Sequence, residues 1–306
     1  MKNFLALLLI VPTFASASEF NTNARGTTTA GFLKLGVGAR AAAMGEAQTA
    51  ASEGAESLYW NPAGLANIES CSATFMHAAY IESSSYDYGA YAHKLKGDKG
   101  VVALGVQYFS AGSLTGTDTT GTETGSFTPN DLAVSVGYAR EIGLGGSVGA
   151  SVKYIQSKIV STAKTAAFDV GWRSLTYGGK ITYGAAVTNL GGKMKFDEAK
   201  ESLPTAVKLG VSYHETANWL TSIDLLLPND NKPGYALGTE YRYKVKEQST
   251  LTGRLGYNSR NSGDQNGLVG IAFGLGFGFK KYSLDYAMVP FGDLGNTHRI
   301  SLSAKF

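Results

Sequence analysis

The sequence has little cysteine, proline or net charge, and each shortage excludes a class of protein or site. Cys71 is the only cysteine among 306 residues, which excludes an internal disulfide and a cysteine-based metal site. Only 7 prolines accompany 39 glycines, 17 tyrosines and 14 phenylalanines, so aromatic residues are more frequent than in a disordered chain. The net charge of +3 is scattered without a run of like charges, and no nucleic-acid partner is expected.

Long apolar runs are missing after the first residues. The opening MKNFLALLLIVPTFASA has an early lysine, an apolar centre and a small-x-small end, which predicts a secretory signal peptide over residues 1–17. No later stretch approaches the ~20 apolar residues that a membrane-spanning helix needs. We therefore expect an exported chain without a helical anchor.

Apolar residues occupy every second position over much of residues 71–306. Val102, Leu104, Val106 and Tyr108, for example, alternate with small or polar residues. A period of two predicts strands, and segments of roughly 10 to 12 residues are long enough to cross a membrane at a tilt. The alternate positions hold mostly Gly, Ala and Ser, which suits a crowded or wet lumen, and tyrosines at the segment ends suit aromatic girdles.

The pattern predicts an all-β fold, a transmembrane antiparallel β-barrel of about fourteen strands. The predicted strands cover residues 71–82, 86–95, 99–110, 130–141, 146–157, 163–175, 179–190, 205–215, 218–227, 233–243, 249–258, 267–278, 281–289 and 297–306. Every second link is short, whereas the others include the long links 111–129, 191–204 and 259–266, and we expect the polar link 111–129 to be a mobile outer loop. Short periplasmic turns and long outer loops are typical of a barrel in the bacterial outer membrane.

Residues 18–70 lack this alternation and predict a hatch held inside a barrel of residues 71–306. Residues 41–53 are small and Ala-rich, which predicts a short helix with Gly45 as its weak point. Asn61 suits a helix N-cap and Pro62 the first helical position, so a tight, capped turn is expected there. The fold prediction is thus a barrel with a short helical N-terminal plug in its lumen.

The run GVGARAAAMGEAQTA followed by LYWNPAGLA resembles the N-terminal signature of the PorV/PorQ group of outer-membrane proteins, relatives of the FadL-like (OMPP1/TodX) channels. These families share a hatch with an Asn-Pro-Ala element and a fourteen-stranded barrel. The matching hatch residues here are Arg40, Glu46, Tyr59, Trp60, Asn61, Pro62, Ala63 and Gly64. The resemblance implies a non-enzymatic accessory of protein export and surface attachment, as in type IX secretion, whose partners are secreted or attachment-complex proteins.

The FadL side of the resemblance implies an alternative, a channel for long-chain fatty acids or other hydrophobic small molecules. Met44, Leu58 and Leu65 would then line a ligand groove together with Tyr59 and Trp60, or else they are packing that locks the hatch. The last strand ends with Ile300, Leu302 and Phe306, which resembles the C-terminal assembly signal that the barrel-assembly machinery reads. We therefore expect an integral protein of the bacterial outer membrane, surrounded by its lipid.

Ten charged residues fall on the small-residue face of the predicted strands. A charge facing lipid would cost up to ~2–4 kcal/mol, so these residues are expected to face the lumen or its rims. They are Lys153, Asp169, Arg173, Lys208, Asp224, Glu240, Arg242, Arg254, Asp285 and Arg299. Two interpretations remain open: ion pairs that hold the wall and, through Arg40, Glu46 and Glu53, the hatch, or a polar permeation path.

No motif predicts catalysis, a cofactor or a metal ion. His77, His93, His214 and His298 lie on separate predicted strands, and no nucleophile elbow, His-Glu-x-x-His or phosphate loop is present. The glycine-rich stretch GIAFGLGFGF opens no helix, so it predicts a close approach of the wall to the hatch rather than a dinucleotide site.

Overall fold

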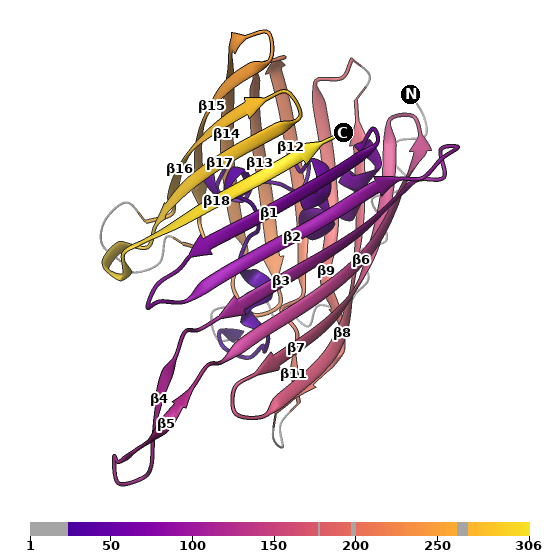
Figure 1. The fold of residues 1–306 in the computed structure, drawn as a ribbon. Helices are drawn as coiled ribbons and strands as arrows, with labels where there is room; N and C mark the ends of the chain where they lie inside the picture. The colour runs from indigo at the N-terminus through magenta and orange to yellow at the C-terminus, as the bar shows by residue number, and fades with distance from the viewer. Residues whose placement is uncertain (1–23, 177, 197–199, 262–268) are drawn as a thin grey trace.

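The barrel is closed and antiparallel. The computed structural model describes residues 24–176, 178–196, 200–261 and 269–306, and the predicted signal peptide lies outside them. Within this part of the chain, fourteen strands follow one another around the barrel, and β1 pairs with β18 to close it (Figure 1).

All fourteen predicted strands are confirmed, and the largest difference is at β16, which begins at Ile271 rather than at residue 267. The barrel strands are β1 Cys71–Ala79, β2 Ser85–Lys94, β3 Val101–Ser110, β6 Asn130–Gly143, β7 Gly146–Lys158, β8 Thr162–Leu175, β9 Ile181–Gly191, β12 Ala206–Thr216, β13 Trp219–Pro228, β14 Gly234–Lys246, β15 Ser249–Asn258, β16 Ile271–Phe279, β17 Tyr282–Pro290 and β18 Asn296–Lys305. The alternation of apolar and small residues was sufficient to locate the strands, because each strand has one apolar face and one small-residue face.

The links between strands differ at the two ends of the barrel. Links 144–145, 217–218, 247–248 and 280–281 are short and lie at the end where β1 begins and β18 ends. The other end, at the bottom of Figure 1, carries the long links. Outer-membrane barrels have short turns on the periplasmic side. We therefore name the end with the short links the periplasmic end and the end with the long links the outer mouth.

Two small hairpins in the long links were not predicted. Link 111–129 contains β4 Leu114–Thr117 and β5 Glu123–Phe127, and the link after β9 contains β10 Lys193–Lys195 and β11 Lys200–Ser202. In the first hairpin, Asp118 Oδ1 accepts hydrogen bonds from the amides of Thr120 (2.8 Å) and Thr122 (2.9 Å). The loop expected at residues 111–129 is therefore a hairpin with an Asx-type turn, because threonines favour strands and Asp binds its own turn.

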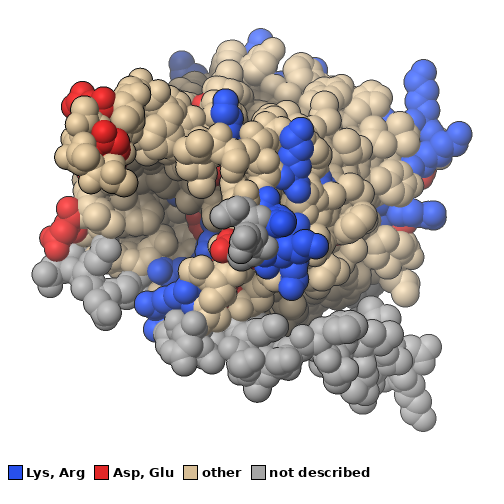
Figure 2. Space-filling view, turned by 90° about the horizontal axis from the view of Figure 1, so that it is seen from below, with Lys and Arg blue, Asp and Glu red and all other residues tan. Residues whose placement is uncertain are grey.

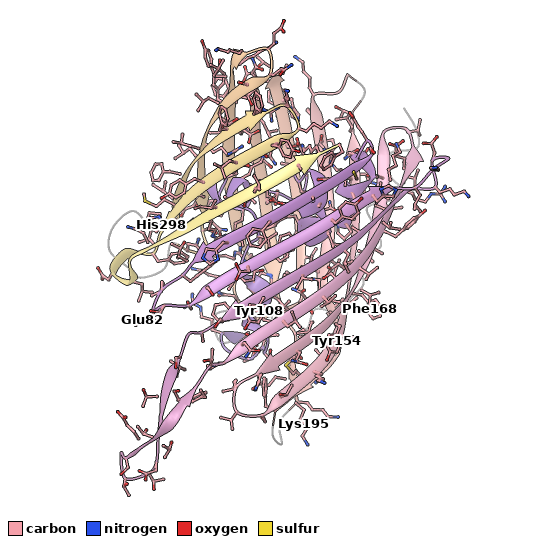
Figure 3. The ribbon with its side chains drawn as sticks, in the orientation of Figure 1. Glu82, Tyr108, Tyr154, Phe168, Lys195 and His298 are labelled. Atoms are coloured by element: carbon pink, nitrogen blue, oxygen red, sulfur yellow. The ribbon has the colours of Figure 1, made fainter. Side chains whose placement is uncertain are left out.

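The outer surface of the wall is apolar. Figure 3 shows Tyr108, Tyr154 and Phe168 on this surface, and more than a third of each side chain is exposed. Leucine, valine, isoleucine and aromatic residues are similarly exposed on the other strands. Continuous exposed apolar surface of this extent matches the lipid-facing band of a transmembrane barrel.

The lumen contains the N-terminal segment, which appears in indigo inside the barrel in Figure 1. Its helices are η2 Gly31–Lys34, α1 Ala39–Ala43, η3 Gly54–Glu56, α2 Ser57–Trp60 and η4 Pro62–Asn67. None of the helices in the described ranges is long and apolar enough to span a membrane.

The helix predicted over residues 41–53 is wrong in its length, because α1 ends at Ala43. Gly45 and Glu46 follow with positive φ angles of 63° and 69°, which stop a right-handed helix. A Cβ atom at Gly45 would overlap the carbonyl oxygen of Tyr257 in β15. The wall therefore decides where the helix stops, and Gly45 is the residue that permits the turn.

Placing lysine on the lipid face should impair assembly more than placing it in the lumen. Leu275 lies in the middle of β16 with 63% of its surface exposed, and Leu275→Lys should cost about 2–4 kcal/mol in the bilayer. Ser283, near the periplasmic end of β17, is half-buried on the lumen side and is the lumen-facing control. The yield of heat-modifiable folded barrel measures the effect, and equal yields for the two variants would contradict the assignment of faces.

Candidate functional site

The hatch, defined here as described residues 24–70, runs through the lumen from one end of the barrel to the other. At the outer mouth the Thr29 amide donates to the Ser202 carbonyl at 3.0 Å. At the periplasmic end Lys305 Nζ lies 2.8 Å from Glu53 Oε2. The hatch then continues into β1 at Cys71, so its ends are attached to opposite ends of the barrel.

Glycines of the wall allow the hatch backbone to lie directly against the strands. Cβ atoms at Gly238 and Gly256 would overlap Met44 and Gly45, and one at Gly184 would overlap the Thr49 carbonyl. In the stretch GIAFGLGFGF, Gly270 precedes the strand, and of the three glycines within β16 only Gly274 meets the hatch in this way, at Ala43. Any larger side chain at these positions would displace the hatch.

The Asn-Pro-Ala turn is held by the wall through Asn61. Its Oδ1 accepts a hydrogen bond from the Ala63 amide at 3.1 Å, so Asn61 is the predicted N-cap of η4. Its Nδ2 donates to the carbonyl oxygens of Thr49 (2.7 Å) and of Trp172 in β8 (3.0 Å). One fully buried side chain therefore connects two hatch segments and the wall.

A wall carboxylate caps the adjacent turn of the hatch. Asp224 Oδ2 on β13 accepts hydrogen bonds from the amides of Gln48 (2.9 Å) and Thr49 (2.7 Å) and from Thr49 Oγ1 (2.6 Å). Three donors on one buried carboxylate oxygen make a strong, directional attachment.

Arg40 joins a chain of ion pairs near the periplasmic end. Its Nε lies 2.9 Å from Glu240 Oε2 on β14. Arg254 bridges the same Glu240 oxygen (2.6 Å) to Asp285 Oδ1 (2.7 Å), and Arg242 approaches Glu240 at 3.4 Å from the rim. Charges of alternating sign satisfy one another here, as buried ions require.

Glu46 joins the wall from the other side of the hatch. It pairs with Arg260 and lies 3.6 Å from Arg299 Nη1. Arg299 also donates to the carbonyl oxygen of Gly36 and the hydroxyl of Tyr80, each at 2.8 Å. The structure thus brings Arg40, Glu46 and Glu53 of the hatch to separate charged partners of the wall.

The other predicted site residues do not pair with the charged side chains of the hatch. Lys153 and Asp169 form a buried pair (3.0 Å), and Arg173 donates to the Ala50 carbonyl (3.1 Å). The apolar residues predicted to line a ligand groove, Met44, Leu58 and Leu65, are completely enclosed between hatch and wall. In the described ranges no group of three His, Cys, Asp or Glu residues could hold a metal ion.

Glu56 is a partly buried hatch carboxylate with no ion-pair partner among the described residues. Burial raises its pKa from 4.5 to about 7, the nearby Asp285 charge adds to the shift, and a hydrogen bond from Thr74 (3.1 Å) opposes it. The protonated form of Glu56 is therefore the one that the folded hatch favours.

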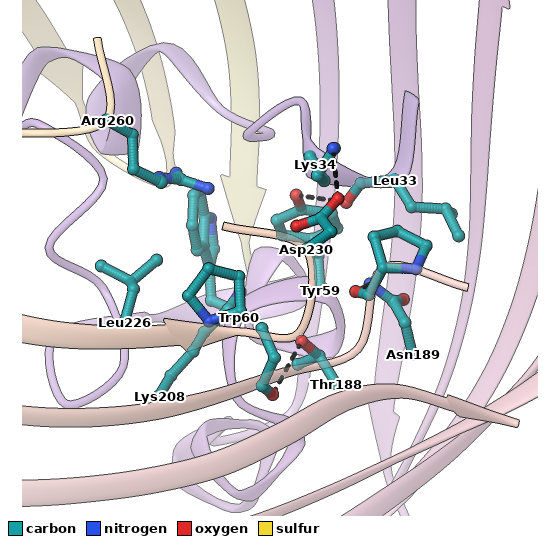
Figure 4. Close-up of a pocket in the computed structure, with 13 residues that line it drawn as sticks. Leu33, Lys34, Tyr59, Trp60, Thr188, Asn189, Lys208, Leu226, Asp230 and Arg260 are labelled. Atoms are coloured by element: carbon teal, nitrogen blue, oxygen red, sulfur yellow. Dashed lines mark hydrogen bonds and ion pairs between the residues drawn. The ribbon is translucent and has the colours of Figure 1, made fainter. Parts of the chain in front are cut away.

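Two recesses open at the outer mouth between hatch and wall. One holds about 430 Å³ of empty space, part of it open to solvent, and is lined by Tyr59, Trp60 and Lys208 among others (Figure 4). The second, of about 600 Å³ including space open to solvent, is lined by apolar residues such as Phe109 and Phe196 and by polar residues such as Asp131 and Lys158. The sequence indicated that Lys208 faces the lumen, but it contained no signal that would place the lysine beside rings more than a hundred residues earlier.

The Asn61 contacts predict that the hatch seal depends on this side chain. Replacing Asn61 and Pro62 by Ala removes three hydrogen bonds and leaves buried carbonyls unpaired, at a cost of roughly 1–3 kcal/mol. We expect a higher single-channel conductance in planar bilayers. Asn67→Ala is the control, because Asn67 is exposed and makes one long hydrogen bond of 3.4 Å; identical conductance of all variants would argue against a seal at this turn.

The Glu56 environment predicts a pH effect on stability. Because the folded-state pKa is above the unfolded value, this group stabilises the fold below about pH 4.5, and the contribution, up to ~3 kcal/mol, is lost as the pH rises through about 7. Glu56→Gln should remove that part of the pH dependence. Thermal unfolding in detergent between pH 5 and 8 measures it, with the exposed Glu69→Gln as control; parallel curves for wild type and Glu56→Gln would refute the assignment.

These features define an outer-membrane β-barrel whose lumen is filled by its own N-terminal segment. The family model described as "Type IX secretion system protein PorV" matches residues 18–227. The chain belongs to the PorV family and is a barrel of the type IX secretion type. No curated protein matches the chain.

Solved structures of FadL-like channels share this fold. The toluene transporter TodX of Pseudomonas putida has a TM-score of 0.59 at 12% identity, covering 88% of this chain and 96% of that chain. The toluene transporter TbuX of Ralstonia pickettii has a TM-score of 0.60 at 15% identity, covering 89% and 98%. A Pseudomonas aeruginosa FadL homologue has a TM-score of 0.58 at 11% identity, covering 88% and 98%.

Proposed function

We propose that this barrel is a non-enzymatic accessory of protein export that engages secreted or attachment-complex proteins at the outer mouth. The observation that carries the proposal is the PorV family match, which extends from the hatch through nine barrel strands to residue 227. Residues 1–17 would export the chain, and Ile300, Leu302 and Phe306 would present the last strand to the barrel-assembly machinery.

The filled lumen supports a role that does not require a wide channel. The hatch is held at several levels of the lumen, by Asn61 of the hatch itself and by Asp224 and Glu240 of the wall. A protein that recognises its partners from outside needs exposed loops on a stable barrel, and a closed barrel with exposed outer hairpins supports that role. The β4–β5 hairpin extends well beyond the wall at the outer mouth (Figure 1) and is the partner-binding element in this proposal.

A channel for hydrophobic small molecules is the second candidate. It is supported by the fold shared with toluene transporters and by the recess whose lining includes Phe109 and Phe196. In this case the hatch would have to move, because Met44, Leu58 and Leu65 are enclosed.

Mass spectrometry of what co-purifies with the barrel after mild detergent extraction distinguishes the candidates. The export role predicts stoichiometric secreted or surface proteins, and replacement of residues 113–127 by a short Gly-Ser link should release them while the barrel still folds. Replacing Lys193, an exposed residue of the β10–β11 hairpin, by Ala is a control at the same end of the barrel. A bound hydrophobe without protein partners would contradict the export role and support the channel.

A further inference from the structure

The periplasmic end of β14 leaves a strand edge without a partner. The last pair between β13 and β14 is Trp219 with Tyr241, whereas β14 continues to Lys246 and stays paired with β15. The Arg242 amide still donates to the Asn218 carbonyl at 2.9 Å, and among the described residues no backbone hydrogen bond continues along that side. The rest of β14 is therefore paired on one side only, in the β14–β15 hairpin at the top of Figure 1.

This edge combines unpaired backbone groups with unpaired positive charge. The amides of an antiparallel strand point alternately to its two sides, so the Lys244 amide points to the same free side as that of Arg242. Lys244 and Lys246 are exposed, and no described side chain forms a hydrogen bond or ion pair with either ammonium group. Free strand edges bind other strands readily, because their amides and carbonyls lack partners.

The lysines limit which strand can pair here. A second copy of this chain on the same edge would bring lysine opposite lysine, and like charges opposite one another destabilise a strand pair. A strand with carboxylates at these positions would instead be stabilised by the same lysines. The edge therefore favours an acidic strand over a second copy of the barrel.

The neighbouring hairpin adds to the positive charge. Residues 242–250 and 278–283 include five cations and one carboxylate, Glu247. The Lys280 amide donates to the Gln248 carbonyl at 2.9 Å, so the tips of the β14–β15 and β16–β17 hairpins lie side by side. The outer mouth differs, because Figure 2 shows Asp and Glu side chains as well as Lys and Arg side chains around it. A surface with one dominant sign of charge attracts partners of the opposite sign.

The other face of this strand end is apolar. Trp219 and Tyr241 pack edge to face, with ring centroids 6.1 Å apart, and mark the aromatic girdle at the membrane boundary. Tyr243 and Val245 lie further along β14, beyond these rings, and are 62% and 45% exposed. Apolar side chains beyond the girdle are suited to contact with a protein rather than with lipid tails.

We propose that this edge binds an extended acidic segment of a periplasmic protein, which adds to the barrel as an antiparallel strand beside β14. Acidic residues of the segment lie near Lys244 and Lys246, and the alternate apolar residues lie near Tyr243. Backbone hydrogen bonds provide affinity in this mode of recognition, and the alternating side chains provide specificity. The proposal goes beyond the export role, since the edge lies at the end of the barrel opposite to the outer hairpins.

Short capped peptides presented to the full barrel in amphipol test the proposal. A peptide of alternating valine and glutamate should bind about tenfold more tightly, by fluorescence anisotropy, than a peptide of alternating valine and lysine. It should have the same advantage over a peptide in which the same valines and glutamates form two blocks. Equal affinity of the alternating and block acidic peptides would show a surface for any anion and would overturn strand addition.

N-methylated peptides test the backbone pairing itself. In antiparallel pairing, the residue opposite Lys244 is a glutamate whose amide bonds to β14, whereas the valine amides point away. Methylation of the glutamate amides should therefore abolish binding, and methylation of the valine amides should leave it nearly unchanged. Equal affinities of the two methylated peptides, or the reverse order, would contradict the proposal.

Charge reversal identifies the lysines that select the partner. Lys244→Glu combined with Lys246→Glu should reverse the preference, so that the lysine peptide binds more tightly than the glutamate peptide. Lys193→Glu combined with Lys195→Glu, on the exposed β10–β11 hairpin at the outer mouth, changes the net charge equally and should leave the preference unchanged. Heat-modified migration reports whether each variant folds, and the peptide comparisons on the wild-type barrel decide the question even where a variant does not. A glutamate preference that survives in the folded Lys244 and Lys246 variant would overturn the proposal.

Discussion

The close contact between the hatch backbone and the glycines of the wall is the constraint on which the rest of this structure depends. Gly184, Gly238 and Gly256 remove side chains where the hatch passes, so backbone meets backbone across the lumen. At such short range, the carbonyls and amides of the hatch need partners from the wall. Asp224 of the wall accepts from the amides of Gln48 and Thr49, and Asn61 of the hatch donates to the Trp172 carbonyl of the wall. The arginine and glutamate pairs add attachment at both ends.

This constraint also explains why the hatch has such short helices. A longer helix after Ala43 would carry side chains into β14 and β15, and the positive φ angles of Gly45 and Glu46 turn the chain along the wall instead. The barrel thus specifies the hatch conformation, and the hatch in turn fills a lumen whose walls are mostly small residues. Neither part has a second packed core on which to fold alone.

The strands could be predicted from the sequence because their signal is local. Alternation at residues such as Val102, Leu104 and Val106 is complete within ten residues, and the difference between short and long links orients the barrel. The extent of α1 could not be predicted, because Ala-rich composition favours helix until the wall interrupts it. The two outer hairpins were missed because the link 111–129 is rich in glycine and threonine, the link 192–205 is rich in charged residues, and neither has a sustained apolar alternation.

The sequence likewise predicts one part of the candidate site, the direction in which its wall residues face, but not their partners in the hatch. An inward orientation could be predicted for Lys208, Asp224 and Glu240, because they lie on the small-residue face of their strands. The structure places all three in the lumen. Which hatch group each of them contacts depends on pairs of residues that are 148 to 200 positions apart in the sequence, and no local pattern encodes such pairs.

Hydrogen–deuterium exchange of the intact barrel in amphipol, followed by peptide mass spectrometry, tests whether the wall holds the hatch in place. If it does, the amides of residues 39–66 exchange as slowly as those of the barrel strands, while the β4–β5 hairpin exchanges quickly. Exchange of the hatch within seconds, with the strands still protected, would show that the wall does not hold the hatch.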